Sequence, residues 1–462
     1  MYAFASSSTP AATNSDDVIR IADGLDQIAR DAAFAADGQP GRATLFVSAT
    51  PHADFSPNAY VTSLADNNFI YVNGTFRGAF NRGQTLEFDA AQGDIVTSDR
   101  GVTGVYSLSG GPGRPVEMAS AAFAGRQFFW YAFRSPPHRH FIQSLAMPAT
   151  VRVYGPNPTV NADGTSPDEP IQEVTLNPYE VFEFTTSQDA EYYATATQPV
   201  VLTTTNYDLD RDQRVVLPLA ADLFGHTVAS QGGGIFISAL FADTNFTVFM
   251  ADGVTYTGTA SPGSPHRLNP LGFESHYANS GWFIVRADGP IAGFAGADGA
   301  GGNATTFAPL SVASQVAATP LAINDNGGRE AGLAFVSEFE GRVAIYQNDG
   351  THLATRELLR HGSLPNPATD TAHQRHPAAA LYHTGEGDFT AKLERGAYVV
   401  ADVPILMIAN MHEGSNRRAE KDETPCYGIT PTTIKAEIRK DAAGLLRHRA
   451  IDGSGTETWE VC

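Results

Sequence analysis

Thr247-Val248-Phe249-Met250-Ala251-Asp252-Gly253 is a β-type run that ends in a turn, and the chain carries related runs at residues 69–74, 150–155 and 343–350. A second β-type run follows each of them, at residues 100–106, 198–203, 289–294 and 403–408. A period of roughly 80 to 100 residues fits a small β-sandwich and is too long for a solenoid repeat. The sequence therefore predicts a mainly β fold, a tandem array of about four β-sandwich-like repeats.

Further strands are expected inside each repeat. One precedes each of the last three turn-ending runs, at residues 141–145, 235–240 and 333–338, with a looser copy at 44–48. The intervals after the strands at 235–240 and 333–338 are short enough to predict hairpins. A third element is expected at residues 84–88, 180–184 and 281–285, and strict alternation of apolar residues in the first two marks strands with one buried face.

Gly/Pro-rich or polar stretches place the boundaries between segments. The expected division is 1–40 for a polar lead and an attachment helix, 41–137, 138–212, 213–326 and 327–411 for the β repeats, and 412–462 for a C-terminal tail. A small helix is expected in this tail, at about residues 433–443. The tail is locally basic, which fits either an acidic partner surface or a solvated helix face.

A helix is also expected between Ser15, a good N-cap, and Gly38. Its apolar residues fall at alternating spacings of three and four and form one stripe: Val18, Ile21, Leu25, Ile28, Ala32 and Ala35. One apolar stripe needs one partner. That partner is either the first β repeat of the chain itself or another protein, in self-association or attachment to a larger assembly.

Composition narrows the function classes. The formal net charge is −20 at pH 7, and a nucleic-acid-binding surface needs a basic footprint, so no nucleic-acid partner is expected. No stretch approaches the ~18 consecutive apolar residues of a membrane span. Residues 1–15 lack the basic and apolar regions of a secretory signal. The two cysteines, Cys426 and Cys462, allow at most one disulfide, with two plain thiols as the alternative.

Few residues suggest chemistry. Asp208, Asp210 and Asp212 place carboxylates at every second position, which is how a calcium loop begins, but the glycine and final carboxylate of such a loop are missing. Ca²⁺ at these residues is the one cofactor that the sequence suggests. His138 with His140, and His373 with His376, lack a third ligand, and exposed loop ends explain them as well.

No nucleophile elbow, phosphate loop, dinucleotide fingerprint or zinc-protease motif occurs, so no enzyme is expected. A glycan-degrading enzyme on a β scaffold would need paired carboxylates and aromatic platforms such as Trp282 or residues 128–131. The simpler interpretation places these aromatic residues in the β core.

The succession Asp243-Thr244-Asn245-Phe246-Thr247-Val248, then Ala287-Asp288-Gly289-Pro290-Ile291-Ala292, resembles the β-repeat of the IgG Fc-binding protein N-terminal region. The later copies keep a proline at Pro199 and Pro404, and the first copy has Gly101 instead. The resemblance covers most of residues 42–411, and it implies the fold more than a function.

The layout, with a heptad helix, acidic β repeats and no enzyme motif, is also similar to that of virion structural proteins of tailed phages of marine bacteria. This resemblance implies a head decoration, neck or fibre component, assembled in the host cytoplasm and displayed on the particle. Its expected partners are other virion proteins, further copies in a homo-oligomer, and host surface glycans. The alternative is a bacterial surface adhesin or carbohydrate-binding protein at the cell surface.

Overall fold

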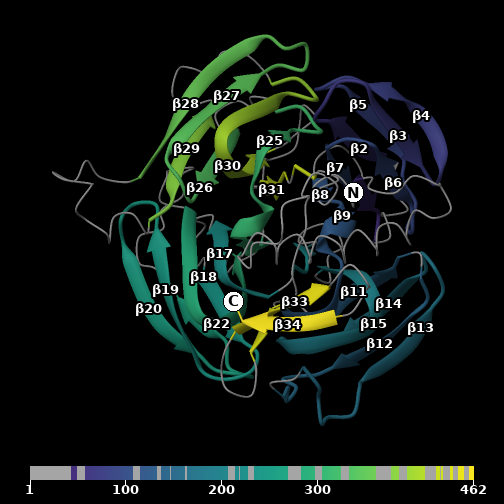
Figure 1. Cartoon of the computed structure of the whole chain (residues 1–462), viewed down its shortest axis with the longest axis vertical. Coiled ribbons are helices and arrows are strands. Elements are labelled where there is room, and N and C mark those ends of the chain that lie inside the picture. Colours follow the sequence, from purple (N-terminus) through teal and green to yellow (C-terminus); the bar gives the residue numbers. More distant parts are fainter. Residues whose placement is uncertain are drawn as a thin grey trace, which may run out of the picture.

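The structure, a computed structural model, is mainly β, and Figure 1 shows its strands gathered in four groups around a common centre. We call these groups the first (β1–β9), second (β10–β16), third (β17–β24) and fourth (β25–β31) quarters. The structure describes residues 43–48, 58–107, 115–132, 137–145, 147–161, 164–205, 214–217, 219–226, 234–268, 282–296, 304–323, 332–360, 376–383, 393–410, 423–426, 428–429, 438–440, 446–451 and 457–461.

The first quarter is a pair of antiparallel sheets. Its strands are β1 (Ala43–Phe46), β2 (Asn58–Ser63), β3 (Asn68–Val72), β4 (Thr75–Phe80), β5 (Thr85–Asp89), β6 (Ile95–Ser98), β7 (Val102–Ser107), β8 (Pro115–Glu117) and β9 (Ala119–Ser120). One sheet has the order β4-β3-β6-β1-β9 and the other β5-β2-β7-β8. A 3-10 turn at Ala121–Phe123 leads to the next quarter.

The second quarter is one sheet that bends into two layers. Its strands are β10 (Gly125–Ala132), β11 (His138–Ser144), β12 (Ala149–Tyr154), β13 (Gln172–Leu176), β14 (Val181–Thr186), β15 (Ala190–Thr205) and β16 (Arg214–Val215). Their main order is β13-β12-β15-β11-β14, and β10 and β16 also pair with β15.

The third quarter repeats this arrangement. Its strands are β17 (Ala220–His226), β18 (Gly234–Ala239), β19 (Thr244–Met250), β20 (Thr255–Ala260), β21 (His266–Leu268), β22 (Trp282–Gly296), β23 (Ala304–Thr306) and β24 (Ala308–Pro309). Strand β22 pairs with β17, β18, β19 and β23. A 3-10 turn at Leu310–Val312 follows.

The fourth quarter closes into a small barrel. Its strands are β25 (Ser314–Ala318), β26 (Gly332–Ser337), β27 (Gly341–Tyr346), β28 (His352–Arg360), β29 (Ala378–His383), β30 (Tyr398–Asn410) and β31 (Glu423–Pro425). The order is β25-β30-β26-β29-β28-β27, and β27 returns to pair with β30. Closure depends on the far end of the long strand β28, where Leu359 and Arg360 pair with β29.

One long strand joins the two layers of each of the last three quarters. In β22, residues 282–287 pair with β17 and β19, and residues 291–296 pair with β18 and β23. Pro290 lies between these halves, as Pro199 does in β15 and Pro404 in β30. Proline has no amide hydrogen to donate to a ladder, so it marks the place where the strand leaves one layer for the other. In the first quarter the strand is interrupted at residues 99–101, between β6 and β7.

The same hydrogen bond braces this crossing in every quarter. In each quarter, the backbone amide of the second residue of the turn-ending strand donates to a side-chain oxygen beside the strand crossing. The four bonds are Phe69 to Asp99 at 2.6 Å, Thr150 to Thr197 at 2.9 Å, Asn245 to Asp288 at 2.8 Å and Arg342 to Asp402 at 2.7 Å. They set Phe69, Thr150, Asn245 and Arg342 at equivalent places.

Several finer sequence predictions are wrong. The hairpins expected after residues 235–240 and 333–338 do not form, because β18 and β19, like β26 and β27, pair with different halves of one long strand. The element at 281–285 is the first half of β22, and the counterpart of β5 and β14 is the three-residue β21. The counterpart of β11 in the first quarter is β2 rather than residues 44–48, of which 44–46 belong to β1. Strands β10 and β25 pair across two of the expected segment boundaries.

Four short strands meet at the centre, one from each quarter. Strand β8 contacts β16, β16 contacts β23, β23 contacts β31, and β31 contacts β8. Around them lies one apolar cluster that draws on all four quarters, with Phe46, Phe141, Trp282 and Ala334 among its members. The quarters therefore share a core, and burial of this apolar surface stabilises them together.

The C-terminal helix expected at about residues 433–443 does not match the structure where the two can be compared. Ile438–Lys440 form strand β32, which pairs with β33 (Leu446–Ile451), and β33 pairs with β34 (Glu457–Val461). The backbone of these short strands forms its hydrogen bonds with a neighbouring strand rather than within a helical turn. The expected N-terminal helix lies outside the described residues.

Candidate functional site

Most residues singled out in the sequence fall outside the part of the chain that the structure describes. These are Val18, Ile21, Leu25, Ile28 and Ala32 of the apolar stripe, Asp208, Asp210 and Asp212 of the calcium candidate, His373 and Cys462. Cys426 is described and is buried beside β30, where its amide donates to the carbonyl of Met407 at 2.9 Å. Burial raises the pKa of the Cys426 thiol, which makes it a weak nucleophile and metal ligand. Its pairing with Cys462 stays a prediction.

His138 and His140 are buried in β11 and do not end an exposed loop. His138 Nε2 lies 2.8 Å from the Asp189 carboxylate. The two ring nitrogens of His140 lie 2.9 Å from the hydroxyl oxygens of Thr186 and Thr204. These contacts tie β11 to its neighbours β14 and β15, so both imidazoles already have side-chain partners.

A buried carboxyl lies between the second and third quarters. Glu191 in β15 is 1% exposed, and its Oε2 accepts a hydrogen bond of 2.5 Å from the amide of Gly263. The Ser238 hydroxyl in β18 also bonds to this carboxyl, and Oε1 has no hydrogen-bond partner in the part of the chain that the structure describes. Burial raises the pKa of Glu191 to about 7. We call the contact between these quarters the carboxyl seam.

Among the described residues, no positive charge favours the ionised form of Glu191, and burial dominates its environment. Tyr131 in β10 is its cross-strand partner, and burial together with Asp189 and Glu191 raises the pKa of this tyrosine. The backbone amide of Glu191 donates to Asn157 Oδ1 at 3.1 Å. A carboxyl placed this way can take up and release a proton near neutral pH.

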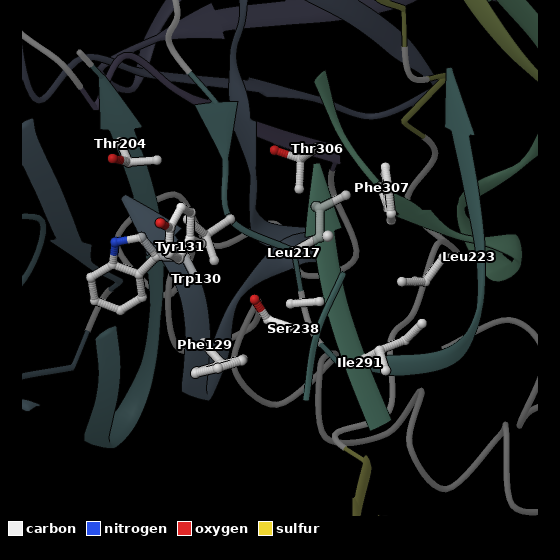
Figure 2. A pocket seen from close by; sticks show the side chains of 13 residues that line it. Phe129, Trp130, Tyr131, Thr204, Leu217, Leu223, Ser238, Ile291, Thr306 and Phe307 are labelled. Atoms are coloured by element: carbon white, nitrogen blue, oxygen red, sulfur yellow. The ribbon is translucent and has the colours of Figure 1, made fainter. Parts of the chain in front are cut away.

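Next to this carboxyl lies a small cavity, shown in Figure 2 with its lining side chains. It is lined by Phe129, Trp130, Tyr131, Thr204, Val216, Leu217, Leu223, Ser238, Ile291, Ala292, Gly293, Thr306 and Phe307. Its volume of about 30 Å³ is enough to hold water. The cavity is therefore too small for a sugar or nucleotide substrate, and its hydroxyl groups suit a bridging water.

A polar contact joins the third and fourth quarters. His376 is buried, its Nδ1 lies 2.7 Å from the Met250 carbonyl oxygen, and its ring packs edge-on against Phe249. Nearby, Arg286 bonds to Asp222 at 3.2 Å and to Glu338 at 2.7 Å. Arg286 thus contacts both carboxylates, and its pair with Glu338 links the third quarter to the fourth.

The first and fourth quarters meet at what we call the closing seam. Here Val102 and Ile429 exchange two backbone hydrogen bonds of 2.8 and 2.9 Å. Gly83 and Gly396 approach so closely that a Cβ on Gly396 would overlap the Gly83 carbonyl oxygen. Arg395 pairs with Glu87 at 2.5 Å and lies 4.7 Å from the centre of the Tyr60 ring.

An exposed aromatic face lies on the first quarter, at strands β3 and β4. Phe69 is 44% exposed and Phe76 is 55% exposed. The Phe76 ring lies 6.0 Å from that of Phe69 and 5.4 Å from that of Tyr71. We call Phe69, Tyr71 and Phe76 the aromatic face, and Figure 1 shows its strands at the outer edge of the molecule.

Sequence reasoning missed both Glu191 and the aromatic face. The signal for Glu191 was a single acid inside the run Ala190-Glu191-Tyr192-Tyr193-Ala194. The signal for the face was aromatic residues at positions of β3 where the other turn-ending strands carry polar or small ones. In the aromatic run of residues 128–131, Phe128, Phe129 and Trp130 are buried and Tyr131 is partly exposed, and Trp282 is also buried.

Within the described ranges, no group of three or more His, Cys, Asp or Glu side chains is placed to hold a metal ion. No helix in this part of the chain has the length and apolar character needed to cross a membrane.

Comparisons with known proteins give no family. No protein-family model and no curated protein matches the chain. Among the solved structures that match is a chain described as "Biofilm associated protein - BSP domain", with 7% sequence identity over 84% of this chain and 96% of that chain. Its TM-score of 0.12 carries no argument about fold or function.

Proposed function

We propose that the protein is a non-enzymatic structural protein of a virion, a head decoration, neck or fibre component that displays β units on the particle surface. The observation that carries the structural part is the shared apolar core, which joins all four quarters into one body. The assignment to a virion, with other virion proteins and copies of itself as partners, rests on the resemblance in sequence layout.

The proposal includes an array of four related β-sandwich-like units. The recurring amide-to-side-chain bond beside each strand crossing supports it. So does the cyclic contact of β8, β16, β23 and β31, each of which follows the crossing strand of its own quarter. Units that share a core in this way cannot move independently, a property that suits a rigid surface component.

The outer strands supply surface for display. Strands β4, β13, β20 and β28 lie at the periphery of their quarters in Figure 1, and many of their side chains are exposed. The cavity beside Glu191 is too small for a sugar or a nucleotide, whereas these outer strands present many side chains to solvent. Contacts with partners therefore form on outer surfaces rather than in a pocket.

Immunogold electron microscopy tests the location. Antiserum raised against the purified chain is applied to virus particles and to cells from the source culture, and the control serum is first adsorbed with the same chain. Gold on particles after a wash in high salt is the expected result. Gold confined to the cell envelope contradicts the virion proposal and favours the surface adhesin or carbohydrate-binding protein.

A further inference from the structure

A bend and a turn from different quarters meet over the carboxyl of Glu191. In the second quarter, at the bend of residues 155–157, the Asn157 amide donates to the Glu191 carbonyl oxygen at 2.8 Å. In the third quarter, the turn of residues 261–264 brings the Gly263 amide to Glu191 Oε2 at 2.5 Å. A Cβ on Gly263 would lie 3.6 Å from Asn157 Cβ. We call this bend and this turn the two seam loops.

The turn at 261–264 is held in shape by its own quarter. Ser261 and Ser264 form a β-bridge, and the Ser264 amide donates to the Ser261 carbonyl oxygen at 3.0 Å. Strand β20, which leads into this turn, pairs with β19 of the same quarter. The bond to Glu191 is therefore not needed to form the turn, and it holds the turn against the second quarter. Loss of this bond separates the two seam loops without unfolding either quarter.

The titratable groups that face Glu191 from the second quarter supply no counter-charge. Tyr131 of β10 is its cross-strand partner. Asp189, in the segment before β15, is paired with His138 at 2.8 Å. Ser238 of β18 brings a neutral hydroxyl from the third quarter. The two seam loops contain no charged side chain, and none of these groups is a cation paired with Glu191.

Strand β21 of the third quarter carries two groups that can be positive. Arg267 lies over the Phe236 ring, 5.3 Å from its centre, and His266 packs edge-on against Phe246. Burial and two hydrogen bonds act on the Glu191 carboxyl, and neither of these side chains neutralises it. An ionised Glu191 is therefore a buried negative charge without a counter-ion.

The proton on Glu191 decides which state of the seam is stable. The neutral carboxyl fits a seam whose apolar cluster includes Phe129 and Leu240. The ionised carboxylate has the Gly263 amide and the Ser238 hydroxyl at Oε2, but Oε1 has no partner among the described residues. Such a charge is more stable when water reaches it, and Ser238 already borders a cavity that can hold water. The pKa of about 7 places this change at neutral pH.

We propose that the carboxyl seam is a proton-operated latch: when Glu191 loses its proton, the two seam loops separate and water enters between the second and third quarters. When the proton returns, the seam closes. The closed form predominates in acid and opens as pH rises through about 7, because the closed seam binds the proton more tightly. This inference goes beyond the proposed function and does not depend on the location of the protein.

Amide exchange in the full chain tests the latch once the intrinsic pH dependence of exchange is divided out. We expect protection in residues 261–264 and at Asn157 to fall about tenfold between pH 6 and pH 8. Glu191→Gln carries no charge at either pH and keeps the same protection at both. Glu180→Gln is the matched control, because the exposed Glu180 also accepts a backbone amide, that of Asn177 at 2.8 Å. It leaves the pH response of the two seam loops intact.

A seam that stays closed gives the opposite result. An ionised carboxylate accepts the Gly263 amide more strongly than a neutral one does, so equal or greater protection of this amide at pH 8 overturns the proposal. An equal loss of protection at Gly253 also overturns it, because the whole chain then loosens. The Gly253 amide donates to the Met250 carbonyl oxygen at 3.1 Å, in a turn beside the fourth quarter.

A cross-link provides a second measurement that does not alter Glu191. Asn157→Cys combined with Gly263→Cys places two Cβ atoms within reach of a disulfide, since 3.6 Å lies in the range of such bonds. In the oxidised variant the seam loops cannot separate, so exchange in residues 261–264 no longer responds to pH, and reduction restores the response. A response of equal size in the oxidised and reduced forms overturns the proposal.

Discussion

At the closing seam two backbones touch at Gly83 and Gly396, whereas at the carboxyl seam side chains fill the space between the quarters. The apolar cluster of the carboxyl seam includes Phe129, Tyr193 and Leu240, and next to it Glu191 is buried without a cation. The closing seam instead combines backbone hydrogen bonds with the ion pair of Arg395 and Glu87.

Chain connectivity explains this difference. The second and third quarters follow each other in sequence, so a short connection already holds them near each other. Burial of apolar side chains is then enough to hold these two quarters together, and the carboxyl seam tolerates the buried Glu191. The first and fourth quarters are the most distant in sequence, and their contact must supply its own specificity. Close backbone fit and directional bonds provide it.

The largest effect is expected from Gly396→Ala. Gly396 has φ +87°, and the added Cβ would overlap the Gly83 carbonyl oxygen, so the seam must move apart. We expect the free energy of unfolding to fall by about 4 kcal/mol in urea denaturation. Gly350→Ala is the matched control, because its φ is +88° and the new Cβ meets only Tyr398 Oη, at 3.8 Å. Its cost is about 1 kcal/mol. Equal losses of unfolding free energy in the two variants would show that the close backbone contact of Gly396 with Gly83 does not determine stability.

Glu191→Gln tests the carboxyl seam through pH. The pKa of Glu191 is about 7 when folded, above the ordinary 4.5, so the folded state holds the proton more tightly. Its stabilisation is complete below pH 4.5 and is lost as pH rises through 7. The variant should match the unaltered chain in acid and exceed its unfolding free energy by about 3 kcal/mol at pH 8. The exposed Glu173→Gln is the control for the loss of a surface carboxylate, and its effect on the unfolding free energy should be small. Parallel profiles for Glu191→Gln and the unaltered chain would contradict the assignment.

Ile429→Ala separates side-chain burial from backbone bonding at the closing seam. The bridge between Val102 and Ile429 uses backbone atoms and survives the change, while the buried side chain is truncated. We expect a loss of about 2 kcal/mol, measured by the same denaturation. Ile171→Ala removes an exposed side chain and should cost less than about 0.5 kcal/mol. A loss at Ile429 no greater than at Ile171 would show that the bridge alone holds this end.

The smallest effect is expected from the ion pair of Arg395 and Glu87. Both side chains are about one-third exposed, so solvent screens their attraction. A double-mutant cycle with alanine at both positions should give a coupling of about 1 kcal/mol that weakens in high salt. The pair of Arg152 and Glu173, whose side chains are about half exposed, should give about 0.3 kcal/mol in the same cycle. Similar couplings for both pairs would mean that the closing seam gains nothing special from its charge.

The sequence pattern was sufficient for the β class and for its repeated landmarks. Residues 69–74, 150–155, 247–253 and 343–350 overlap β3, β12, β19 and β27, each of which begins one to three residues earlier, and the prolines at 199, 290 and 404 lie at the strand crossings. These features are local, since a turn after an apolar run and a proline in a strand each have a direct backbone cause.

The features that sequence reasoning missed depend on distant contacts. Residues 282–285 look like an independent strand because nothing nearby shows that β22 continues past Pro290 into the other layer. The three-residue β21 is too short for a period of two to be recognised. The environment of Glu191 is created by Gly263 and Ser238, which belong to another quarter. No local pattern contains this information.

The ring of β8, β16, β23 and β31 has a consequence for synthesis on the ribosome. Translation produces β8 first and β31 last. The central side chains of the first quarter therefore lack their final contacts until the fourth quarter has been synthesised. At about 5 to 20 residues per second, the interval between the synthesis of β8 and that of β31 lasts tens of seconds. During it, the nascent chain presents apolar surface such as that around Phe46 without its final neighbours. Cells producing this protein must therefore hold a growing chain away from its neighbours until the ring is complete.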